Sequence, residues 1–442
     1  MEINPKLCYS APKHPVKSIT GTGVYQAAMS KINPVPSPLF DGLEAMLADD
    51  DYQPKLPKAF QEDYHYARNF LLSYQGSKDT FNSYRRDIER YLQWCHLKEN
   101  KTLKQIRRAE FERFLSFCQK PPKTWIATTV QPKFIESDGE KVPNPKWRPF
   151  VAKISKVDTK MGKAPDKADY MLSEKAFKAL FAIIGSFYAY LMQEEYTLVN
   201  PTLLIRQKTK YYKKKPSSTQ IRRLSELQWG YVIETAEMMA EENPEKYART
   251  LFVMNALYGM YLRISELVVT DRWTPTMGDF HRDPDGLWWF ATVGKGNKER
   301  KISVSNAMLK ALKAYRKSLG LSLLPSPNER TPLLISHNTN QPLRNTRFIR
   351  ELVQECFDRA CDRLLADNQQ EEADQLANAT VHWLRHTGIS DDIKIRPREH
   401  VRDDAGHSSG AITDKYIDVD LRERNSSAKR KRIKPDFLNE DD

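Results

Sequence analysis

The 442-residue chain is poor in cysteine and has no long apolar run. Its five cysteines form no CxxC pair, so neither a disulfide framework nor a paired-cysteine metal site is expected. Two of them, Cys356 and Cys361, fall in an amphipathic pattern typical of buried free thiols. No apolar run approaches the roughly 18 residues that a membrane-spanning helix needs, and the polar, proline-broken start is unlike a signal peptide. We therefore expect a reduced, cytoplasmic protein without a membrane span.

Positive charge is in excess along the chain. The 70 Lys and Arg residues outnumber the 57 Asp and Glu residues, which gives a formal net charge of +13. This balance indicates a polyanionic partner, with DNA or RNA ahead of an anionic membrane surface. At this length, two or three domains are expected rather than a single core.

Changes in composition and periodicity divide the chain into parts. Residues 1–58 carry eight prolines and little periodicity, which indicates an extended arm with one short helix at Leu39–Leu47. Beyond Glu62, apolar residues recur at helical spacing until a proline- and lysine-rich insertion interrupts them. The predicted parts are an arm at 1–58, a helical domain at 59–205 with its insertion at about 119–170, a basic linker at 206–221, a second domain at 222–420 and a tail at 421–442.

Basic side chains gather in the helical domain and in the linker region, where residues 206–223 hold eight Lys or Arg and no acid. A basic helical face is often no more than a solvated surface, and a charge run is often only a linker. Given the overall positive charge, contact of these residues with nucleic-acid phosphates is about as well supported as a solvated surface. The affinity for the nucleic acid would then fall steeply as the salt concentration rises. The residues predicted to bind DNA are Arg85, Arg86, Lys208, Lys210, Lys213, Lys214, Lys215, Lys298 and Arg300.

The second domain begins with helical patterns and then changes period. Helices are predicted over about 225–240 and 244–269, followed by a β-hairpin whose strands flank the glycine-rich turn GKGNKE. Further helices are predicted at about 306–318 and 345–365. An acidic, glutamine-rich segment at 366–380 is interpreted as a surface extension, and more helix follows it.

Residues suited to phosphate chemistry lie between His382 and Tyr416. His382 and Arg385 share a face of a predicted helix, and a guanidinium is a permanent, two-pronged donor for phosphate. His386 completes an HxxxH spacing, but Trp383 stands where a zinc helix of the HExxH type needs glutamate, so we reject a metal site. Tyr416 follows a serine N-cap by about two turns and is a side chain able to form a covalent intermediate. Most helical tyrosines only pack, so Tyr416 alone is a weak indication.

Two upstream segments add charged groups of the same kind. In ALYGMYLRISELVV, Arg263 lies among apolar residues. Burial of its charge is costly unless the guanidinium has a partner or a function, and Glu266 is a candidate to hold it in place. Two separated arginines are suited to clamp the non-bridging oxygens of one phosphate. The hairpin turn lacks the GxxxxGK[ST] of a Walker motif, and its Lys295 is instead suited to protonate a leaving alkoxide.

Taken in chain order, these residues resemble the tyrosine recombinase family, also called phage integrases. YLRISEL is similar to the first arginine box of that family, GKGNKER to its β-hairpin lysine motif, HWLRHT to its second box, and GHSS with Tyr416 to its His-to-Tyr spacing. The resemblance covers about 225–420 and extends more weakly over 62–205. It implies a mainly α fold with a small antiparallel β-sheet, in which a helical core-binding domain and a mixed α/β catalytic domain form a clamp around DNA.

The resemblance also implies a role for each residue. Tyr416 attacks the scissile phosphate to give a 3′-phosphotyrosine and a free 5′-hydroxyl, and Lys295 protonates the leaving oxygen. Arg263 and Arg385 stabilise the pentavalent phosphate, with Glu266 supporting the first of them.

Two histidines complete the implied site: His382 as acid/base to the tyrosine and His407 as a donor to a phosphate oxygen. Because the phosphotyrosine conserves the bond energy, no cofactor, metal or ATP is implied. The implied partners are double-stranded DNA sites, on which a homotetramer, or a tetramer with a paralogue, exchanges strands through a Holliday junction. Such recombinases act in the cytoplasm, at the nucleoid, in bacteria that host a phage or another mobile genetic element.

Two other functions remain open from the sequence. A type IB topoisomerase uses the same chemistry as a monomer to relax supercoils, and a non-catalytic DNA-binding regulator is compatible with the fold. The GKGNKER and GHSS sequences favour the recombinase, and no catalytic position is missing. Two stretches depart from the family pattern, because VRDDAGHSS is unusually polar and the tail after Tyr416 is strongly basic.

Overall fold

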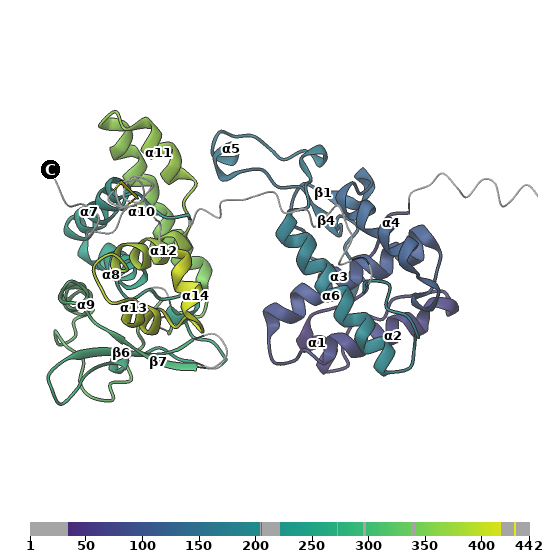
Figure 1. The fold of residues 1–442 in the computed structure, drawn as a ribbon, viewed down its shortest axis with the longest axis horizontal. Helices are drawn as coiled ribbons and strands as arrows, with labels where there is room; N and C mark the ends of the chain where they lie inside the picture. Colours follow the sequence, from purple (N-terminus) through teal and green to yellow (C-terminus); the bar gives the residue numbers. More distant parts are fainter. Residues whose placement is uncertain are drawn as a thin grey trace, which may run out of the picture. The chain divides into compact units, whose positions relative to one another are not determined.

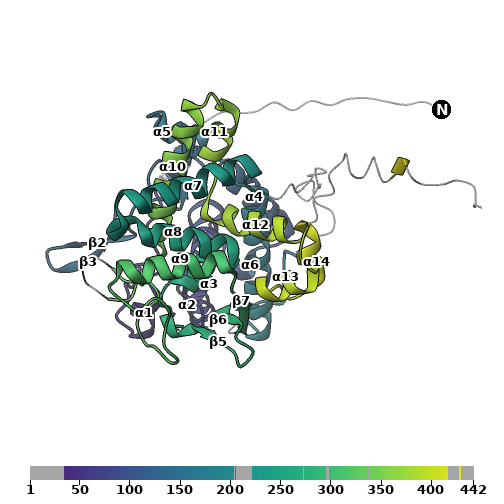
Figure 2. The same ribbon diagram turned by 90° about the vertical axis from the view of Figure 1, so that its left-hand side faces the viewer.

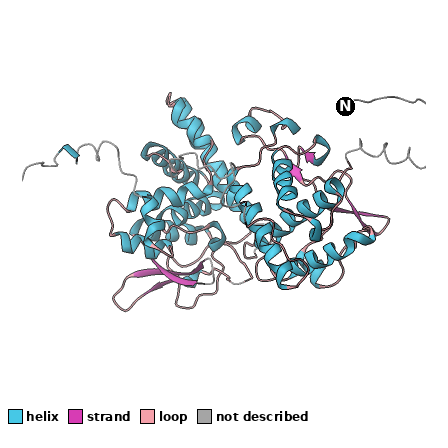
Figure 3. Ribbon diagram, turned by 45° about the vertical axis from the view of Figure 1, so that its right-hand side comes forward, coloured by secondary structure: helices cyan, strands magenta, loops and turns pink. Residues whose placement is uncertain are grey.

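A computed structural model of the chain describes residues 34–203, 205, 222–271, 273–294, 298–336, 339, 341–416 and 428–429. The chain forms two compact units, Met1–Lys214 and Lys215–Asp442 (Figure 1). The predicted basic linker at 206–221 lies outside the described residues, as does most of the predicted tail. Helix dominates both units and the strands are few and short (Figure 3), so the mainly α fold is confirmed.

The first unit is a helical bundle with an aromatic core. Phe70, Tyr91, Phe114 and Phe187 come from its four longest helices and are all buried. The hydroxyl groups of Tyr91 and Tyr188 lie 2.8 Å apart and satisfy each other inside this core. The elements of the unit are α1 (Leu43–Leu47), α2 (Lys58–Leu72), α3 (Lys78–Trp94), α4 (Arg108–Gln119), α5 (Lys156–Lys160), α6 (Glu174–Gln193), β1 (Ile126–Ala127), β2 (Phe134–Ser137), β3 (Glu140–Pro143) and β4 (Phe150–Val151).

Helix α6 is, by length and composition alone, apolar enough to cross a membrane, contrary to the expectation from the sequence. Eight of its side chains are buried in the core of the first unit. Its N-terminus is capped by Ser173, whose hydroxyl accepts a hydrogen bond from the Ala176 N–H at 3.2 Å. These contacts are typical of a core helix.

Residues 34–57 pack into the first unit instead of forming the end of the predicted arm. Leu39 is buried, and its backbone N–H donates to the buried carboxylate of Glu89 at 2.7 Å. The indole N–H of Trp125 donates to the carbonyl of Pro34 at 3.1 Å. Proline disfavours regular helix, but an extended segment can still bury its backbone through such long-range hydrogen bonds.

The insertion predicted at 119–170 is folded as well. Strands β1 and β4 pair in parallel, and β2 and β3 form an antiparallel hairpin that projects outward in Figure 2. Trp147 is buried beneath Lys133, whose ammonium lies 5.4 Å from the indole centroid and pairs with Glu89. Part of the insertion therefore contributes to the core of the first unit, through Trp125, Ile126 and Phe150.

The second unit packs helices around α8, with a three-stranded antiparallel sheet in the order β5-β6-β7. Cys356 and Cys361 are buried free thiols, as predicted. The predicted hairpin is also confirmed, and Gly294 pairs with Lys298 at its end. The elements are α7 (Glu226–Glu242), α8 (Pro244–Gly259), β5 (Phe280–Arg282), β6 (Trp288–Gly294), β7 (Lys298–Ser303), α9 (Asn306–Ser318), α10 (Thr346–Ala366), α11 (Gln370–Ala377), α12 (Val381–Asp392), α13 (Arg398–Ala405) and α14 (Gly410–Thr413).

Helix α11 corrects the interpretation of 366–380 as a surface extension. Ala373 and Leu376 are buried in the core of the second unit. The Ser225 hydroxyl, which caps α7, donates to the carboxylate of Glu372 at 2.8 Å. The acidic composition reflects the outer face of α11, while its inner face is apolar.

A close helix crossing places α12 against α8. A Cβ added at Gly388 would lie 2.1 Å from the carbonyl oxygen of Tyr258, so only glycine fits there. The crossing brings the first turns of α12 next to the residues that follow α8, where the candidate site is built.

Candidate active site

Arg263 lies in an extended segment, because α8 ends earlier than predicted. The helix expected over 244–269 stops at Gly259, and Tyr261 adopts a left-handed conformation with φ of 49°. A short 3-10 turn, Ile264–Leu267, follows. The Glu266 carboxylate accepts the backbone N–H of Arg263 at 2.8 Å and its Nη1 at 3.0 Å. This capping contact starts the 3-10 turn and fixes the direction of the guanidinium.

Glu266 holds a second arginine in addition to Arg263. Arg300 from β7 donates Nη1 and Nη2 to the two carboxylate oxygens of Glu266, both at 2.8 Å, in a bidentate pair. Burial alone would raise the pKa of Glu266, but the hydrogen bonds from Arg300 hold it below its ordinary value. Glu266 therefore stays ionised, and the expected support for Arg263 is present in the geometry.

Arg385 projects from α12 and is buried, with 5% of its surface exposed. Its guanidinium donates to two backbone carbonyls, that of Tyr261 through Nη1 and that of Ala405 through Nη2, the latter at 2.8 Å. In the described part of the chain no ion pair involves Arg385. Burial, followed by the charge of Arg263, lowers the pKa of Arg385 to about 10, so it remains a cation at neutral pH. The site thus contains a buried positive charge held by neutral groups.

His407 lies between Arg385 and the last turn before Tyr416. Its Nδ1 is 2.9 Å from the Thr413 hydroxyl and its Nε2 is 3.4 Å from Nη2 of Arg385. Burial, followed by the charge of Arg385, lowers the pKa of His407 to about 4. The imidazole is therefore neutral at physiological pH and close to the guanidinium that would hold an anion.

Tyr416 closes a 3-10 turn after α14 and is only 8% exposed. Its hydroxyl lies 2.8 Å from Nδ1 of His386, one turn beyond His382 on α12. The phenol ring lies between two imidazoles, with ring centroids 5.4 Å from His386 and 5.6 Å from His407. Burial raises the pKa of Tyr416, while the charges of Arg385 and Arg263 act in the opposite direction.

His382 is exposed at the start of α12, and its ring centroid is 5.9 Å from that of His386. The structure therefore places His382 on the solvent side of the histidine that contacts the tyrosine. His382 and His386 show the HxxxH spacing, but no group of three metal-ligating side chains exists among the described residues.

Lys295 lies outside the described residues, but the strand that leads to it does not. A Cβ added at the preceding residue, Gly294, would lie 2.8 Å from Nη1 of Arg300 and 3.4 Å from Nη1 of Arg263. Strand β6 therefore reaches the arginine pair at the residue before the predicted lysine.

The polar stretch VRDDAGHSS is explained by a buried carboxylate that the sequence did not single out. Asp404, on α13, accepts hydrogen bonds from the Ser303 hydroxyl at 2.5 Å and from Nη2 of Arg396 at 2.6 Å. Its backbone carbonyl accepts Nε of Arg300 at 3.1 Å. Asp404 therefore joins α13 to the β7 strand that carries Arg300, and its charge is compensated by Arg396.

We predict that Asp404→Ala destabilises the second unit by about 2–3 kcal/mol, because Arg396 loses its carboxylate and Ser303 its acceptor. Asp403→Ala is the matched control, since Asp403 is exposed and pairs only with Arg402 on the surface; its effect should stay within about 0.5 kcal/mol. Urea unfolding of both variants measures the difference. Equal midpoints would contradict this account of the polar stretch.

The residues predicted to bind DNA have different environments. The sequence predicts Arg300 as a DNA-binding residue, and in the structure its guanidinium donates to Glu266 and to the carbonyl of Asp404. Arg85 donates Nη1 to the carbonyl of Asp41 and is partly buried in the first unit. DNA contact remains a prediction for the exposed Arg86 and Lys298. The others, Lys208, Lys210, Lys213, Lys214 and Lys215, lie outside the described residues.

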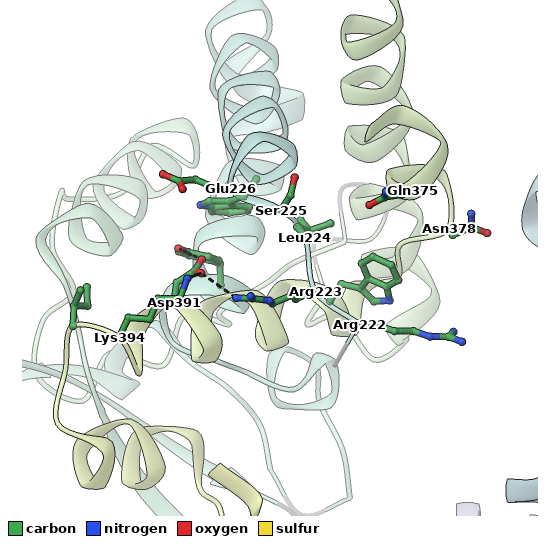
Figure 4. A pocket seen from close by; sticks show the side chains of 13 residues that line it. Arg222, Arg223, Leu224, Ser225, Glu226, Gln375, Asn378, Asp391 and Lys394 are labelled. Carbon is green, nitrogen blue, oxygen red and sulfur yellow. Dashed lines mark hydrogen bonds and ion pairs between the residues drawn. The ribbon is translucent and has the colours of Figure 1, made fainter. Parts of the chain in front are cut away.

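A cavity of about 960 Å³ opens beside the first turn of α7 (Figure 4). Trp229, Trp383 and Tyr258 line it together with Arg223 and Asp391, which form an ion pair at 3.9 Å. Arg385 and His386 do not line this cavity, so it is not the candidate active site.

The residues that sequence reasoning missed are His386 and Asp404. The HxxxH spacing indicates His386 only as a candidate zinc ligand, although it lies four residues after His382 and thus one turn along the same helix. Asp404 lies on α13, eight residues after Arg396, which lies in the loop before that helix, so the spacing alone does not indicate a contact. Only the fold brings each of them to its partner.

The chain is similar to known recombinases, although no protein-family profile matches it. The tyrosine recombinase XerD of Staphylococcus saprophyticus is 25% identical over 252 residues, which cover 56% of this chain and 72% of that protein. Over this span the chain is similar to the tyrosine recombinase family. XerD of Rickettsia prowazekii is 29% identical over 172 residues, 37% of this chain and half of that tyrosine recombinase.

Two solved structures are also similar to the chain. XerH bound to palindromic difH substrate matches with a TM-score of 0.49 and 13% identity, over 88% of this chain and 93% of that one. The Tn1549 transposon integrase, in complex with a circular intermediate DNA, also matches with a TM-score of 0.49 and 13% identity, over 83% of this chain and 98% of that one.

Proposed function

We propose that the protein is a site-specific DNA recombinase or integrase of a mobile genetic element. It cuts and rejoins DNA strands through a 3′-phosphotyrosine intermediate and a Holliday junction. The observation that carries the proposal is the buried Arg385 guanidinium, bound by two backbone carbonyls within reach of a tyrosine hydroxyl. A buried cation without a carboxylate partner is costly unless an anion joins it, and a phosphodiester is an anion that also reacts with a phenol.

The residues of the site have distinct tasks in this reaction. Arg263 and Arg385 stabilise the charge that develops on the non-bridging oxygens, and Glu266 keeps the first of them oriented. His407 completes the set beside Arg385 as a donor to a phosphate oxygen. Lys295, which follows the strand that reaches Arg263, protonates the leaving 5′-oxygen.

The assembly and location follow from the same reaction. Double-stranded DNA sites are the partners, and the helical first unit and the catalytic second unit both contact them. A homotetramer, or a tetramer with a paralogue, exchanges strands in pairs in the cytoplasm of the host. Energy is conserved in the phosphotyrosine, so neither metal nor ATP takes part.

Covalent trapping on nicked suicide DNA tests the chemistry. The wild-type protein is expected to form an adduct on its cognate site in the presence of EDTA and without ATP, and mobility shifts should weaken steeply with salt. Failure to form an adduct on any DNA taken from the flanks of the gene would contradict the enzymatic proposal. Recombination between two site-bearing plasmids, without relaxation of plasmids that lack a site, separates a recombinase from a type IB topoisomerase.

A further inference from the structure

The two backbone carbonyls that hold Arg385 belong to segments far apart in the chain. The carbonyl of Tyr261 lies just beyond the end of α8, and the carbonyl of Ala405 lies at the end of α13. The Arg385 guanidinium keeps its direction only while both carbonyls stay in place. A contact that ties these two segments together therefore sets the direction in which Arg385 faces a phosphate.

Arg396, in the loop between α12 and α13, makes such a contact. Its Nη1 donates to the hydroxyl of Tyr261 at 2.9 Å, and its Nη2 donates to the carboxylate of Asp404 at 2.6 Å. Asp404 directly precedes Ala405 in the chain. One guanidinium thus joins the residue that supplies the first carbonyl to the neighbour of the residue that supplies the second.

Asp392, at the end of α12, completes the contact from a third element. Its carboxylate accepts the hydroxyl proton of Tyr261 and also accepts Nη1 of Arg396 at 3.2 Å. Burial, followed by the hydrogen bond to Asp392, raises the pKa of Tyr261, so its hydroxyl stays protonated. The hydroxyl therefore accepts from Arg396 and donates to Asp392, with a partner in each role.

The backbone of Tyr261 depends on this support. With φ of 49°, Tyr261 lies in the left-handed region, which a residue with a large side chain rarely adopts. Its ring is fully buried, belongs to the same small hydrophobic cluster as Tyr416, and lies where a Cβ at Gly388 would be 3.3 Å from its Cδ1. Packing of the ring and hydrogen bonds to the hydroxyl together hold the Tyr261 carbonyl toward Arg385.

We propose that Arg396 and the hydroxyl of Tyr261 are positioning residues for DNA cleavage, and that they act through Arg385. They orient its guanidinium by holding the two carbonyls that accept it, and they make no bond to the phosphate. This inference rests on the proposed phosphotyrosine chemistry, in which Arg385 stabilises the charge on the non-bridging oxygens.

Two conservative variants of the full-length protein test the inference by single-turnover cleavage of a suicide DNA. Tyr261→Phe removes the hydroxyl and leaves the ring, and Arg396→Lys keeps the charge but cannot reach both sides as a planar guanidinium does. We expect each variant to lower the rate of adduct formation at saturating DNA by about 10- to 10²-fold, because a misdirected Arg385 stabilises the transition state less well. Mobility shifts should show little change in DNA affinity.

A similar contact between α8 and α10 supplies matched controls. There, Nη2 of Arg359 donates to the Tyr247 hydroxyl at 2.8 Å, and that hydroxyl donates to the carboxylate of Glu355 at 2.8 Å. Tyr247→Phe and Arg359→Lys therefore make the same chemical changes in the same unit, and both should cleave at the wild-type rate. Thermal unfolding of the four variants shows how much stability each of them loses.

A double variant decides whether the Tyr261 hydroxyl acts through Arg385. If it does, Tyr261→Phe should cause no further loss once Arg385→Ala is present, and the double variant should cleave as fast as Arg385→Ala alone. A hydroxyl that matters only for folding would lower the rate by the same factor in both backgrounds. That result, or a wild-type rate for Tyr261→Phe or Arg396→Lys, would overturn the inference. Absence of an adduct with the wild-type protein would instead contradict the proposed function, so the two failures are distinguishable.

Discussion

Tyr416→Phe is expected to abolish the covalent protein–DNA adduct while DNA binding is retained. The change deletes only the hydroxyl that attacks phosphorus, and the ring keeps its place between His386 and His407. A water molecule that replaces the hydroxyl is not held in position to attack the phosphate, so no cleavage above background is expected. Denaturing gels of the protein incubated with suicide DNA measure the adduct, and mobility shifts measure binding.

Tyr231→Phe is the matched control for this change. Its hydroxyl donates to Asp367 at 2.6 Å on the surface of the second unit, away from the candidate site. The control should form adduct at the wild-type rate. An adduct that survives Tyr416→Phe would assign the nucleophile elsewhere and remove the basis of the proposed mechanism.

Arg385→Ala is expected to lower the cleavage rate by about 10²- to 10³-fold at saturating DNA, because a fixed charge next to the phosphorane is lost. Arg385→Lys should recover little of this rate. The planar guanidinium reaches the carbonyls of Tyr261 and Ala405 at once, and a single ammonium cannot hold both and still face a phosphate.

The matched control is Arg402→Lys, since Arg402 pairs with Asp403 at the surface of α13 and lies three residues before Ala405, whose carbonyl binds Arg385. It should cleave at the wild-type rate. Single-turnover kinetics measure all three variants, with thermal unfolding as the check on folding. Wild-type cleavage by Arg385→Lys would show that charge alone, without the two-pronged geometry, accounts for the role of this residue.

The sequence predicted the parts of this protein that depend on local pattern. The hairpin of β6 and β7, the helix that carries Arg385, and the contact of Glu266 with Arg263 all follow from spacing within a few residues. The resemblance brought distant segments together, and the structure places Arg263, Arg385, His407 and Tyr416 in one electrostatic neighbourhood.

Long-range contacts explain what the sequence did not reveal. Helix α8 ends at Gly259, and beyond its end the Tyr261 carbonyl accepts a hydrogen bond from Arg385 on α12. The acidic composition of α11 gives no indication that Ala373 and Leu376 pack inward. The sequence predicts Arg300 as an exposed basic residue on a hairpin, because the residues next to it in the chain do not indicate that Glu266 pairs with it. Each difference arises from a partner far away in sequence.

Two guanidinium groups share one carboxylate in the candidate site, and a third lies close to them. Arg263 and Arg300 both bind Glu266, while Arg385 lies close enough for their charges to lower its pKa. Without DNA, the positive charges of these three guanidinium groups therefore repel one another. A phosphodiester turns that repulsion into attraction, so binding and folding are thermodynamically linked. A bound phosphodiester is therefore expected to raise the thermal stability of the second unit before any strand is cut.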